Sequence, residues 1–205
     1  MIEDKHYDIR YLTSIPEWKI YKENCAAYGL IPVLQDMGPG IRGVEIGVCL
    51  GINSYMLLET CPNIAQIVGV DHYMAYKDWD REIQQFEQDF NYEKILINME
   101  YMGPRFNLIR EHSQAAADEI EDESLDFVFI DGDHSMKAVL NDLDYYWPKI
   151  KTNGIVSGHD SNLFSVNFSV TSWIKRKGMD SASVNNTMNT AWWFRKTAVQ
   201  HQPLI

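Results

Sequence analysis

The chain has 205 residues, of which 45% are hydrophobic and 12% aromatic, and this predicts one globular α/β domain with a full core and no second domain of comparable size. Its formal net charge of -11 disfavours a nucleic-acid substrate, because phosphate backbones are bound by basic surfaces. No apolar run approaches the roughly 20 residues that span a bilayer, and the polar N-terminus lacks the apolar core of a signal peptide.

The cysteines are odd in number and show no C-x-x-C pair, namely Cys25, Cys49 and Cys61. This pattern indicates neither a disulfide framework nor a zinc site. We therefore expect reduced thiols in a cytoplasmic protein that has no membrane partner.

The N-terminal segment is expected to form helices that lie beside the main domain. Ser14-Ile15-Pro16-Glu17 has the pattern of a capping box with proline in the first turn, which predicts a helix start. A second short helix is predicted from Pro32 to Met37. We expect a helical cap over 1–40, a main domain over 41–197 with a lid or insert over 72–105, and a loose tail over 198–205.

Residues 43–71 predict a strand, a glycine-bearing turn, a helix capped by Asn53 or Ser54, and a second strand that ends at an acid. Gly47 and Gly51 bracket the turn, where a side chain would obstruct a ligand lying against the backbone. Asp71, at the end of the second strand, is placed to accept hydrogen bonds from two ribose hydroxyls. The stretch therefore predicts a nucleoside-cofactor site.

The residues of this turn also indicate which nucleoside cofactor fits. The dinucleotide fingerprint needs a middle glycine that lets the backbone approach a pyrophosphate, and here Cys49 stands at that position. Glu45, at the end of the first strand, would sit badly beside a pyrophosphate. It would sit well near a cationic cofactor that carries an ammonium and a sulfonium.

The crossover from His72 to Arg105 is longer than a plain crossover helix needs, which is typical of lids and binding loops. Its helix is predicted to carry one apolar face with Ile83, Phe86 and Phe90. Three aromatic residues just past Asp71 are candidates either for cofactor or substrate contact or for ordinary packing: Tyr73, Tyr76 and Trp79.

The next elements bring further polar residues to strand ends. A strand over Phe106 to Arg110 leads to Ser113, which is predicted to cap a helix over Gln114 to Glu121. A buried strand over Phe127 to Ile130 ends at Asp131. Ser135 is then predicted to cap a helix whose apolar side carries Met136, Val139, Leu140, Leu143 and Trp147.

The C-terminal part predicts a strand, a helix and a closing hairpin. Asn153-Gly154 signals a turn before a strand that begins at Ile155 and ends in Gly158-His159-Asp160. A helix follows with Val166, Val170, Trp173 and Ile174 on its apolar side. The hairpin is expected to pair 181–184 with 191–195 through a turn near Asn185-Asn186.

Taken in order, the segments V-E-I-G-V-C-L-G, I-V-G-V-D-H, L-D-F-V-F-I-D-G-D-H-S and G-I-V-S-G-H-D resemble class I S-adenosylmethionine-dependent methyltransferases, in particular the small bacterial O-methyltransferases of methyltransferase family 24. The resemblance covers residues 43–196. It implies a Rossmann-like three-layer sandwich: a seven-stranded, mostly parallel sheet with an antiparallel C-terminal strand and helices on both faces. With S-adenosyl-L-methionine as the cofactor, the expected contacts are Glu45, Gly47, Val48, Gly51, Ser54, Asp71, His72, Ser113, Gln114 and Asp131.

Acids at several strand ends should meet at one edge of the parallel sheet, where their mutual repulsion favours a shared cation. Metal-dependent O-methyltransferases resemble the chain here, and Asp131 and Asp160 match two of their ligand positions, which implies a possible Mg²⁺ site. The third ligand of that family falls on Ser161, so Asp133 or Asn162 would have to replace it. The alternative is that these acids hydrogen-bond only to backbone, cofactor or substrate.

Two histidines flank the same place, each beside an acid: His134 and His159. An imidazole that titrates near neutrality suits removal of a proton from a hydroxyl, and we favour His134 as this base. Together with Asp131, the two histidines form the predicted catalytic set. The expected reaction is in-line attack of a small-molecule hydroxyl, on a sugar or a secondary metabolite, upon the sulfonium methyl.

Other functions stay open at this stage. A nicotinamide-dependent oxidoreductase is disfavoured by the missing glycine and by Glu45. A non-catalytic cofactor-binding protein on the same fold, N-methylation and protein methylation are further alternatives, because fold does not determine the acceptor. A homo-oligomer is also left open.

Overall fold

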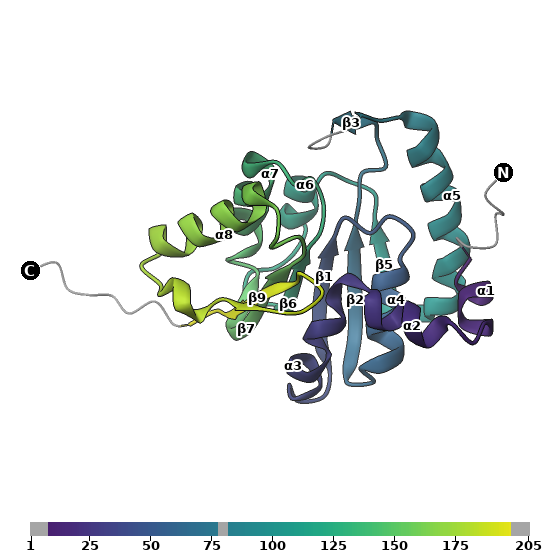
Figure 1. Ribbon diagram of the computed structural model, residues 1–205, viewed down its shortest axis with the longest axis horizontal. Helices are drawn as coiled ribbons and strands as arrows, with labels where there is room; N and C mark the ends of the chain where they lie inside the picture. Colours follow the sequence, from purple (N-terminus) through teal and green to yellow (C-terminus); the bar gives the residue numbers. More distant parts are fainter. Residues whose placement is uncertain (1–7, 78–81, 198–205) are drawn as a thin grey trace, which may run out of the picture.

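The computed structural model describes residues 8–77 and 82–197, and its centre is a seven-stranded sheet between two layers of helices (Figure 1). The strand order is β5-β2-β1-β6-β7-β9-β8. The first five strands in this order are parallel to one another, and β9 pairs antiparallel with both β7 and β8. The strands are β1 (Ile41–Ile46), β2 (Ile64–Val70), β5 (Phe106–Ile109), β6 (Leu125–Ile130), β7 (Ile150–Gly158), β8 (Asn185–Asn186) and β9 (Trp192–Arg195). The predicted fold class is confirmed.

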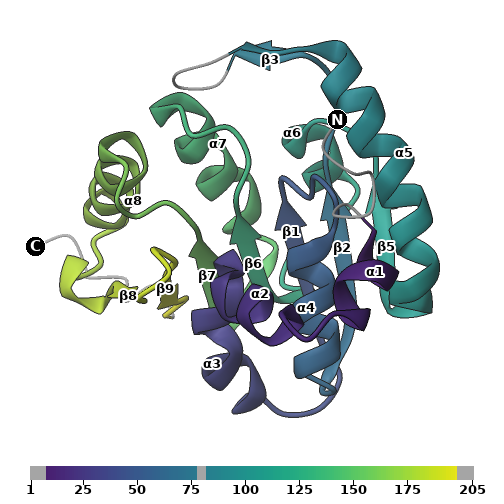
Figure 2. The ribbon, with the colours of Figure 1, turned by 45° about the vertical axis from the view of Figure 1, so that its right-hand side comes forward.

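Helices cover both faces of the sheet, and α2 and α4 stand in front of it in Figure 2. The face with the N-terminal helices carries α1 (Ile9–Ser14), α2 (Trp18–Asn24), α3 (Ile31–Gln35), α4 (Ile52–Thr60) and α5 (Gln85–Met102). The opposite face carries α6 (Ser113–Asp118), α7 (Met136–Tyr146) and α8 (Phe164–Arg176). A small hairpin of β3 (Tyr76–Lys77) and β4 (Glu82–Ile83) precedes α5.

The central strand β6 shows why the sheet is covered on both sides. Its apolar residues alternate, so that Phe127 and Phe129 enter the core beneath α4 and α5, while Val128 and Ile130 enter the core beneath α6, α7 and α8. All four side chains are at most 5% exposed. A continuous apolar run of this kind is stable only between two layers, which fits a parallel strand.

The predicted capping box near the N-terminus is wrong. Ser14 is the last residue of α1, where its hydroxyl donates to the carbonyl of Tyr11 at 2.7 Å, and α2 begins only at Trp18. The reason lies upstream, because the Asp8 side chain caps α1 by accepting from the Arg10 N–H at 2.8 Å. The second predicted helix is α3, shifted to Ile31–Gln35.

Two predicted helix caps are also wrong. Helix α4 has Gly51 at its N-cap, and Asn53 and Ser54 lie within its first turn. Helix α6 has His112 at its N-cap, and Ser113 is its first residue. In both helices the side chains that were expected to cap the backbone donate hydrogen bonds to a buried carboxylate instead, Glu45 for α4 and Asp142 for α6.

The helix of the long crossover buries a different face from the predicted one. Ile83 lies in β4 rather than in the helix, and Phe86 is 72% exposed. The buried face of α5 includes the polar Asn98, whose side chain accepts from the Ile9 N–H and donates to the Leu50 carbonyl. An amide whose hydrogen bonds are all made can be buried, but the spacing of apolar residues does not predict its burial. The predicted contact residue Trp79 and the predicted tail lie outside the described residues.

The C-terminal strands differ from the prediction in two places. Strand β7 continues through Asn153-Gly154, where a turn was predicted, because this segment and Lys196 exchange two backbone hydrogen bonds of 2.8 and 2.9 Å. The first strand of the hairpin is Asn185–Asn186, where the turn was expected. The residues predicted as that strand form a 3₁₀ turn over Ser181–Ser183. In the described part of the chain, no helix has the length and apolarity that crossing a bilayer requires.

Candidate active site

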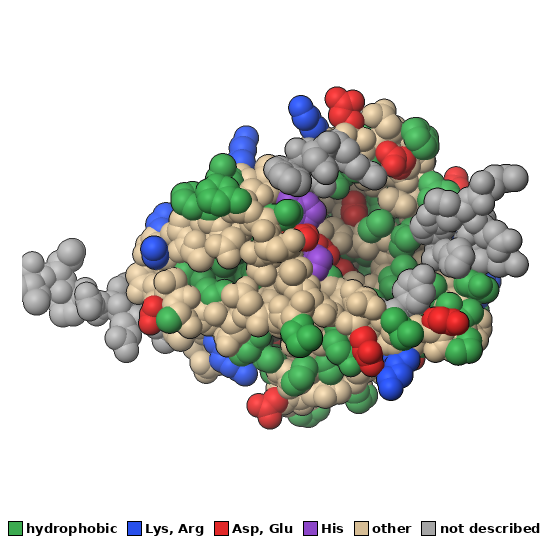
Figure 3. Space-filling view, in the orientation of Figure 1, with side chains coloured by type: hydrophobic (Ala, Val, Ile, Leu, Met, Phe, Trp, Pro, Cys, Tyr) green, Lys and Arg blue, Asp and Glu red, His purple; other side chains and the backbone are tan. Residues whose placement is uncertain are grey.

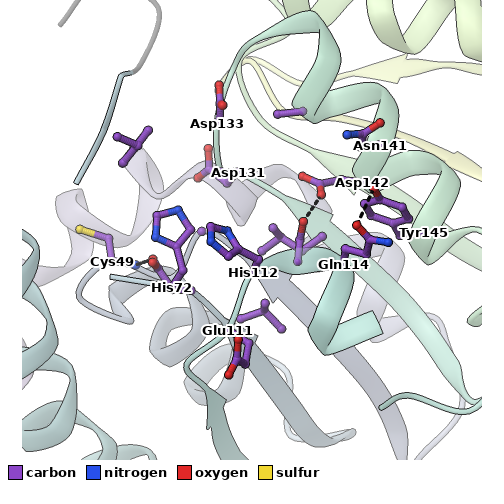
Figure 4. Close-up of a pocket in the computed structure, with 18 of the residues that line it drawn as sticks. Cys49, His72, Glu111, His112, Gln114, Asp131, Asp133, Asn141, Asp142 and Tyr145 are labelled. Atoms are coloured by element: carbon purple, nitrogen blue, oxygen red, sulfur yellow. Dashed lines mark hydrogen bonds between the residues drawn. The ribbon is translucent and has the colours of Figure 1, made fainter. Parts of the chain in front are cut away.

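A cavity of about 550 Å³ lies at the carboxyl ends of β1, β2, β5 and β6 (Figure 4). The sheet extends outward from β1 in one direction through β2 to β5, and in the other through β6 to β7. This reversal of strand order is where open α/β sheets bind ligands. Helix α7 forms another wall, and the β3–β4 hairpin and α5 contribute Tyr76, Ile83, Gln88 and Asn91.

The cavity separates the predicted cofactor contacts into two groups. The predicted contacts that line the cavity are Gly47, Asp71, His72, Ser113, Gln114 and Asp131. Those that are not part of its lining are Glu45, Val48, Gly51 and Ser54. The lining residues come from the ends of four strands, and the others lie in or beneath the turn after β1. Their roles toward a cofactor stay predictions.

The turn after β1 needs both of its glycines. Gly47 has a φ of +83°, and a Cβ there would lie 2.2 Å from the backbone oxygen of Asp131. Gly51 has a φ of +75°, and a Cβ there would lie 2.4 Å from the Cδ1 atom of Ile95. The first glycine therefore lets the turn approach the end of β6, and the second lets α4 start beneath α5.

We expect Gly47→Ala to lower the free energy of unfolding by about 2–4 kcal/mol, because it combines left-handed strain with contact against backbone that cannot move aside. Gly178→Ala is the matched control, since Gly178 has a φ of +72° but open space around its Cβ position. It should cost only about 1–2 kcal/mol. Urea denaturation measures both, and equal losses would show that the contact with β6 does not matter.

Asp71 ties the end of β2 to the turn. One carboxylate oxygen accepts from the N–H groups of Val48 and Cys49 at 3.1 and 3.0 Å, and the other accepts from the Tyr73 N–H at 3.0 Å. An ionised carboxylate has about four acceptor positions, so Asp71 keeps capacity for ligand hydroxyls. Tyr73 is fully buried, and its hydroxyl donates to the Cys49 carbonyl at 2.8 Å, which makes it a packing residue.

Glu45 lies beneath the turn and is only 2% exposed. It accepts hydrogen bonds from the Asn53 amide at 2.9 Å and from the Ser54 hydroxyl. Asn53 also accepts from the Ala27 N–H at 2.9 Å, which connects the N-terminal segment to this network. Burial raises the pKa of Glu45 to about 7, and the two hydrogen bonds oppose that shift.

A raised carboxyl pKa makes stability depend on pH. The stabilisation from neutral Glu45 is present below its unfolded pKa of about 4.5 and is lost as the pH rises to its folded pKa of about 7. Between about pH 5 and about pH 8 the wild type should lose about 2–3 kcal/mol more unfolding free energy than Glu45→Gln. Urea denaturation at both pH values measures the difference, and identical pH dependence in the two proteins would contradict it.

The cavity also contains two groups that the sequence analysis did not identify, the His112 ring and the Asp142 carboxyl group. The rings of His72 and His112 have centroids 4.6 Å apart, and His72 Nδ1 accepts from the Met74 N–H at 2.8 Å. The Ser113 hydroxyl donates to Asp142 at 2.5 Å, a carboxyl group that is 4% exposed and whose pKa burial raises to about 7. Asp142 could have been found from the sequence, because it falls on the same face of its helix as the apolar residues Val139 and Leu143.

A second group of side chains adjoins the cavity at Asp131, and we call Asp131, His134, His159 and Asp160 the acid–histidine cluster. His134 Nε2 lies 2.8 Å from an Asp160 carboxylate oxygen and 3.9 Å from an Asp131 oxygen. His159 Nδ1 lies 3.1 Å from the same Asp160 oxygen and 3.5 Å from Asp131. Histidine and acidic side chains are visible together beside a hollow in Figure 3. The fold thus brings the three predicted catalytic residues, Asp131, His134 and His159, close to one another.

The two histidines of the cluster differ in their surroundings. His159 Nε2 is 2.9 Å from the Asn189 carbonyl, which can only accept, so this nitrogen carries a proton. Burial works against its charged form, but the hydrogen bonds to Asp131 and Asp160 outweigh burial and raise the pKa of His159 to about 10. Hydrogen bonds from both histidines hold the pKa of Asp160 well below its usual range. His159 is therefore cationic at neutral pH and unsuited to accept a proton.

The cluster also contains the only arrangement of potential metal ligands found among the described residues. One atom each of Asp131, His134 and Asp160 lies within 4.8 Å of the others. The third member is His134 and neither of the predicted alternatives: Asp133 accepts from the Ser135 N–H at 2.8 Å, and Asn162 is an exposed surface residue. The sequence analysis assigned His134 only the role of a base, whereas Asp131 and Asp160 were predicted as ligands.

The comparisons with known proteins agree with this geometry. A family model described as a methyltransferase domain matches residues 44–161. The uncharacterized protein y4gI of Sinorhizobium fredii is 26% identical over 132 residues, which cover 63% of this chain and 14% of that protein. The chain therefore spans a small part of the length of the curated relative it matches.

Solved structures share the fold at low sequence identity. Cofactor-bound Rv0187 from MTB is 12% identical with a TM-score of 0.57, over 88% of this chain and 81% of that one. A Corynebacterium glutamicum protein is 10% identical with a TM-score of 0.55, over 84% and 81%. Precorrin-6y C5,15-methyltransferase of Geobacter metallireducens is 15% identical with a TM-score of 0.52, over 72% and 68%. At these identities the likeness shows the fold alone.

Proposed function

The chain belongs to the family of methyltransferase domains, and from this premise we propose that it transfers a methyl group from S-adenosyl-L-methionine to a hydroxyl of a small molecule such as a sugar or a secondary metabolite. The observation that carries the proposal is the adjacency of two sites. The cavity at the strand ends has the lining for a cationic nucleoside cofactor, and the acid–histidine cluster adjoins it through Asp131.

The charge of the cavity supports this choice of cofactor. Its described lining includes the acids Asp71, Glu111, Asp131 and Asp133, in addition to the buried Asp142, but no lysine or arginine. Such a wall attracts a ligand with an ammonium and a sulfonium, and it repels the pyrophosphate of a nicotinamide dinucleotide. When bound, S-adenosylmethionine supplies an electrophilic methyl group on sulfur. The residues of the cavity fit this group, and the oxidoreductase alternative is disfavoured.

Each residue then has a defined role. Asp71 accepts the ribose hydroxyls, and Gly47 lets the ligand lie against the turn. At the cluster, Asp160 holds the ring of His134 through the 2.8 Å contact, in the way a carboxylate orients a catalytic imidazole. His134 would take the proton of the acceptor hydroxyl while the hydroxyl oxygen bonds to the methyl carbon, the methyl–sulfur bond breaks and S-adenosylhomocysteine leaves. Cationic His159 offsets the negative charge of both acids.

The cluster does not fit Mg²⁺ well. Magnesium prefers six oxygen ligands in octahedral geometry, whereas one of the three groups here is the imidazole of His134. His159 also already supplies positive charge to Asp131 and Asp160. The proposed reaction therefore has no Mg²⁺-dependent step. We expect neither millimolar MgCl₂ nor a chelator to shift the unfolding temperature by more than about 1 °C, because an ion that does not bind adds no stability. A larger Mg²⁺-dependent shift would restore the metal hypothesis.

Turnover tests the proposed function directly. The protein is incubated with S-adenosylmethionine and a panel of catechols, flavonoids, sugars and matched amines, and release of S-adenosylhomocysteine is measured. We expect release with a hydroxylated acceptor and none with its amine counterpart. Release only with amines or with protein would replace O-methylation by another methyl transfer. Cofactor binding without release on any acceptor would favour the non-catalytic alternative.

A further inference from the structure

The far end of the cavity holds two polar side chains whose hydrogen-bonding polarity is set by residues behind them. Ser113 and Gln114 line the cavity at the start of α6. The Ser113 hydroxyl donates to Asp142 at 2.5 Å, and Gln114 Oε1 accepts from the Tyr145 hydroxyl at 3.2 Å; both hydrogen bonds are drawn in Figure 4. The two partners, Asp142 and Tyr145, both lie on α7.

These two bonds decide what each inner residue offers a ligand. A serine hydroxyl has one proton, and here the proton is engaged by Asp142, so Ser113 presents oxygen lone pairs as an acceptor. The Gln114 oxygen is engaged by Tyr145, so this side chain presents its amide N–H groups as donors. The backbone between them is also held, because the buried Tyr146 hydroxyl donates to the Ser113 carbonyl at 3.0 Å.

An acceptor beside a donor is complementary to the edge of adenine, where an exocyclic amine donates next to a ring nitrogen that accepts. It is mismatched to hypoxanthine, where a carbonyl oxygen and a ring N–H reverse both roles. We propose that Asp142 and Tyr145 are positioning residues that make the cofactor site selective for a 6-amino purine over a 6-oxo purine, by fixing the polarity of Ser113 and Gln114. This inference rests on the proposed function, because it assumes a purine nucleoside in the cavity.

The location of Asp142 supports a role in polarity rather than in charge attraction. The carboxyl group is 4% exposed, and one of its oxygens is engaged by the Ser113 hydroxyl at the cavity wall. An exposed acid would attract any cationic group, whereas a buried acceptor acts on the hydroxyl that it orients. Asp142 on α7 therefore acts on a ligand indirectly, by orienting the Ser113 hydroxyl on α6.

The test compares binding of S-adenosylhomocysteine and S-inosylhomocysteine by isothermal titration calorimetry. Measurements are made at about pH 8.5, above the Asp142 pKa of about 7, so that this group is ionised. The wild type should prefer the adenine ligand about 100-fold, since two mismatched polar contacts each cost about tenfold. Asp118→Asn, an exposed acid at the end of α6, is the control and should keep this preference.

Asp142→Asn is the decisive variant, because its amide can donate as well as accept and so frees the Ser113 proton to turn toward a ligand. We expect the preference to fall at least about tenfold, with tighter binding of S-inosylhomocysteine than in the wild type. Tyr145→Phe removes only the donor to Gln114, and it should shift the preference in the same direction even if the first variant does not fold. A damaged site weakens both ligands, so gained affinity for the 6-oxo ligand separates positioning from structure.

Three results separate the proposals. Equal affinity of the wild type for the two ligands would overturn the positioning role and leave the methyltransferase proposal intact. Parallel weakening of both ligands in both variants would also overturn it. If the wild type bound neither ligand, the cofactor assignment itself would fail, and the inference with it.

Discussion

Replacing His134 with glutamine is expected to lower methyl transfer by about 10²–10⁴-fold, the usual contribution of a general base. The reason is geometric and electrostatic. His159 is already cationic because its pKa is raised to about 10, and the proposed base is therefore the other histidine of the cluster, His134. Its ring is held 2.8 Å from Asp160. Turnover is measured as S-adenosylhomocysteine released with the acceptor that the panel identifies.

The same variant should bind S-adenosylhomocysteine within about threefold of the wild type, because a residue that acts only in the transition state changes kcat rather than ligand affinity. Lys137→Gln, an exposed neighbour on α7, is the matched control and should keep full turnover. Turnover of His134→Gln near the wild-type rate would remove this residue from the mechanism. A parallel loss in affinity would instead indicate a role in holding the ligand.

Asp71→Asn should weaken binding of S-adenosylhomocysteine by about 10²–10³-fold. In the proposed function Asp71 offers charge-assisted hydrogen bonds to ribose hydroxyls, and such bonds contribute about 1.5–3 kcal/mol each. The variant also loses charge on the acceptors for the Val48 and Cys49 N–H groups, which loosens the turn. Calorimetric titration measures the affinity, and the unfolding temperature without ligand shows how much of the loss comes from the turn.

The control for this variant is again Asp118→Asn, which removes one negative charge from an exposed position on α6. It should bind the ligand as the wild type does, because screened charges at a distance contribute little. An Asp71→Asn variant with wild-type affinity would show that the acid only organises the turn and does not touch the ribose.

Local patterns in the sequence predicted the sheet well, together with the edge at which its cavity lies. The apolar run at β6 required cover on both faces, and an acid directly after it had to lie at the carboxyl edge, where Asp131 is found. Gly47 was predicted for close approach of a ligand, and the structure adds a second reason in the backbone of β6. These features depend on residues that are close together in the sequence, so a single segment is enough to predict them.

The features that the sequence did not predict depend on partners far apart in the chain. Ser54 and Ser113 each fit the pattern of a helix cap, but Glu45 and Asp142 take their hydroxyls across elements. The buried Asn98 satisfies backbone groups of two other segments, which apolar periodicity cannot reveal. Tertiary hydrogen bonds therefore overrode local preferences at these sites.

The most direct test of the account is thermal unfolding with S-adenosylhomocysteine, with NAD, and with neither. A ligand at about a hundred times its dissociation constant adds about 2.7 kcal/mol, which shifts the unfolding temperature by several degrees at about 2–4 °C per kcal/mol. We expect this shift with S-adenosylhomocysteine and none with NAD. A shift with NAD alone would contradict the assignment of the acid-lined cavity, and with it the methyltransferase mechanism built on Asp71 and His134.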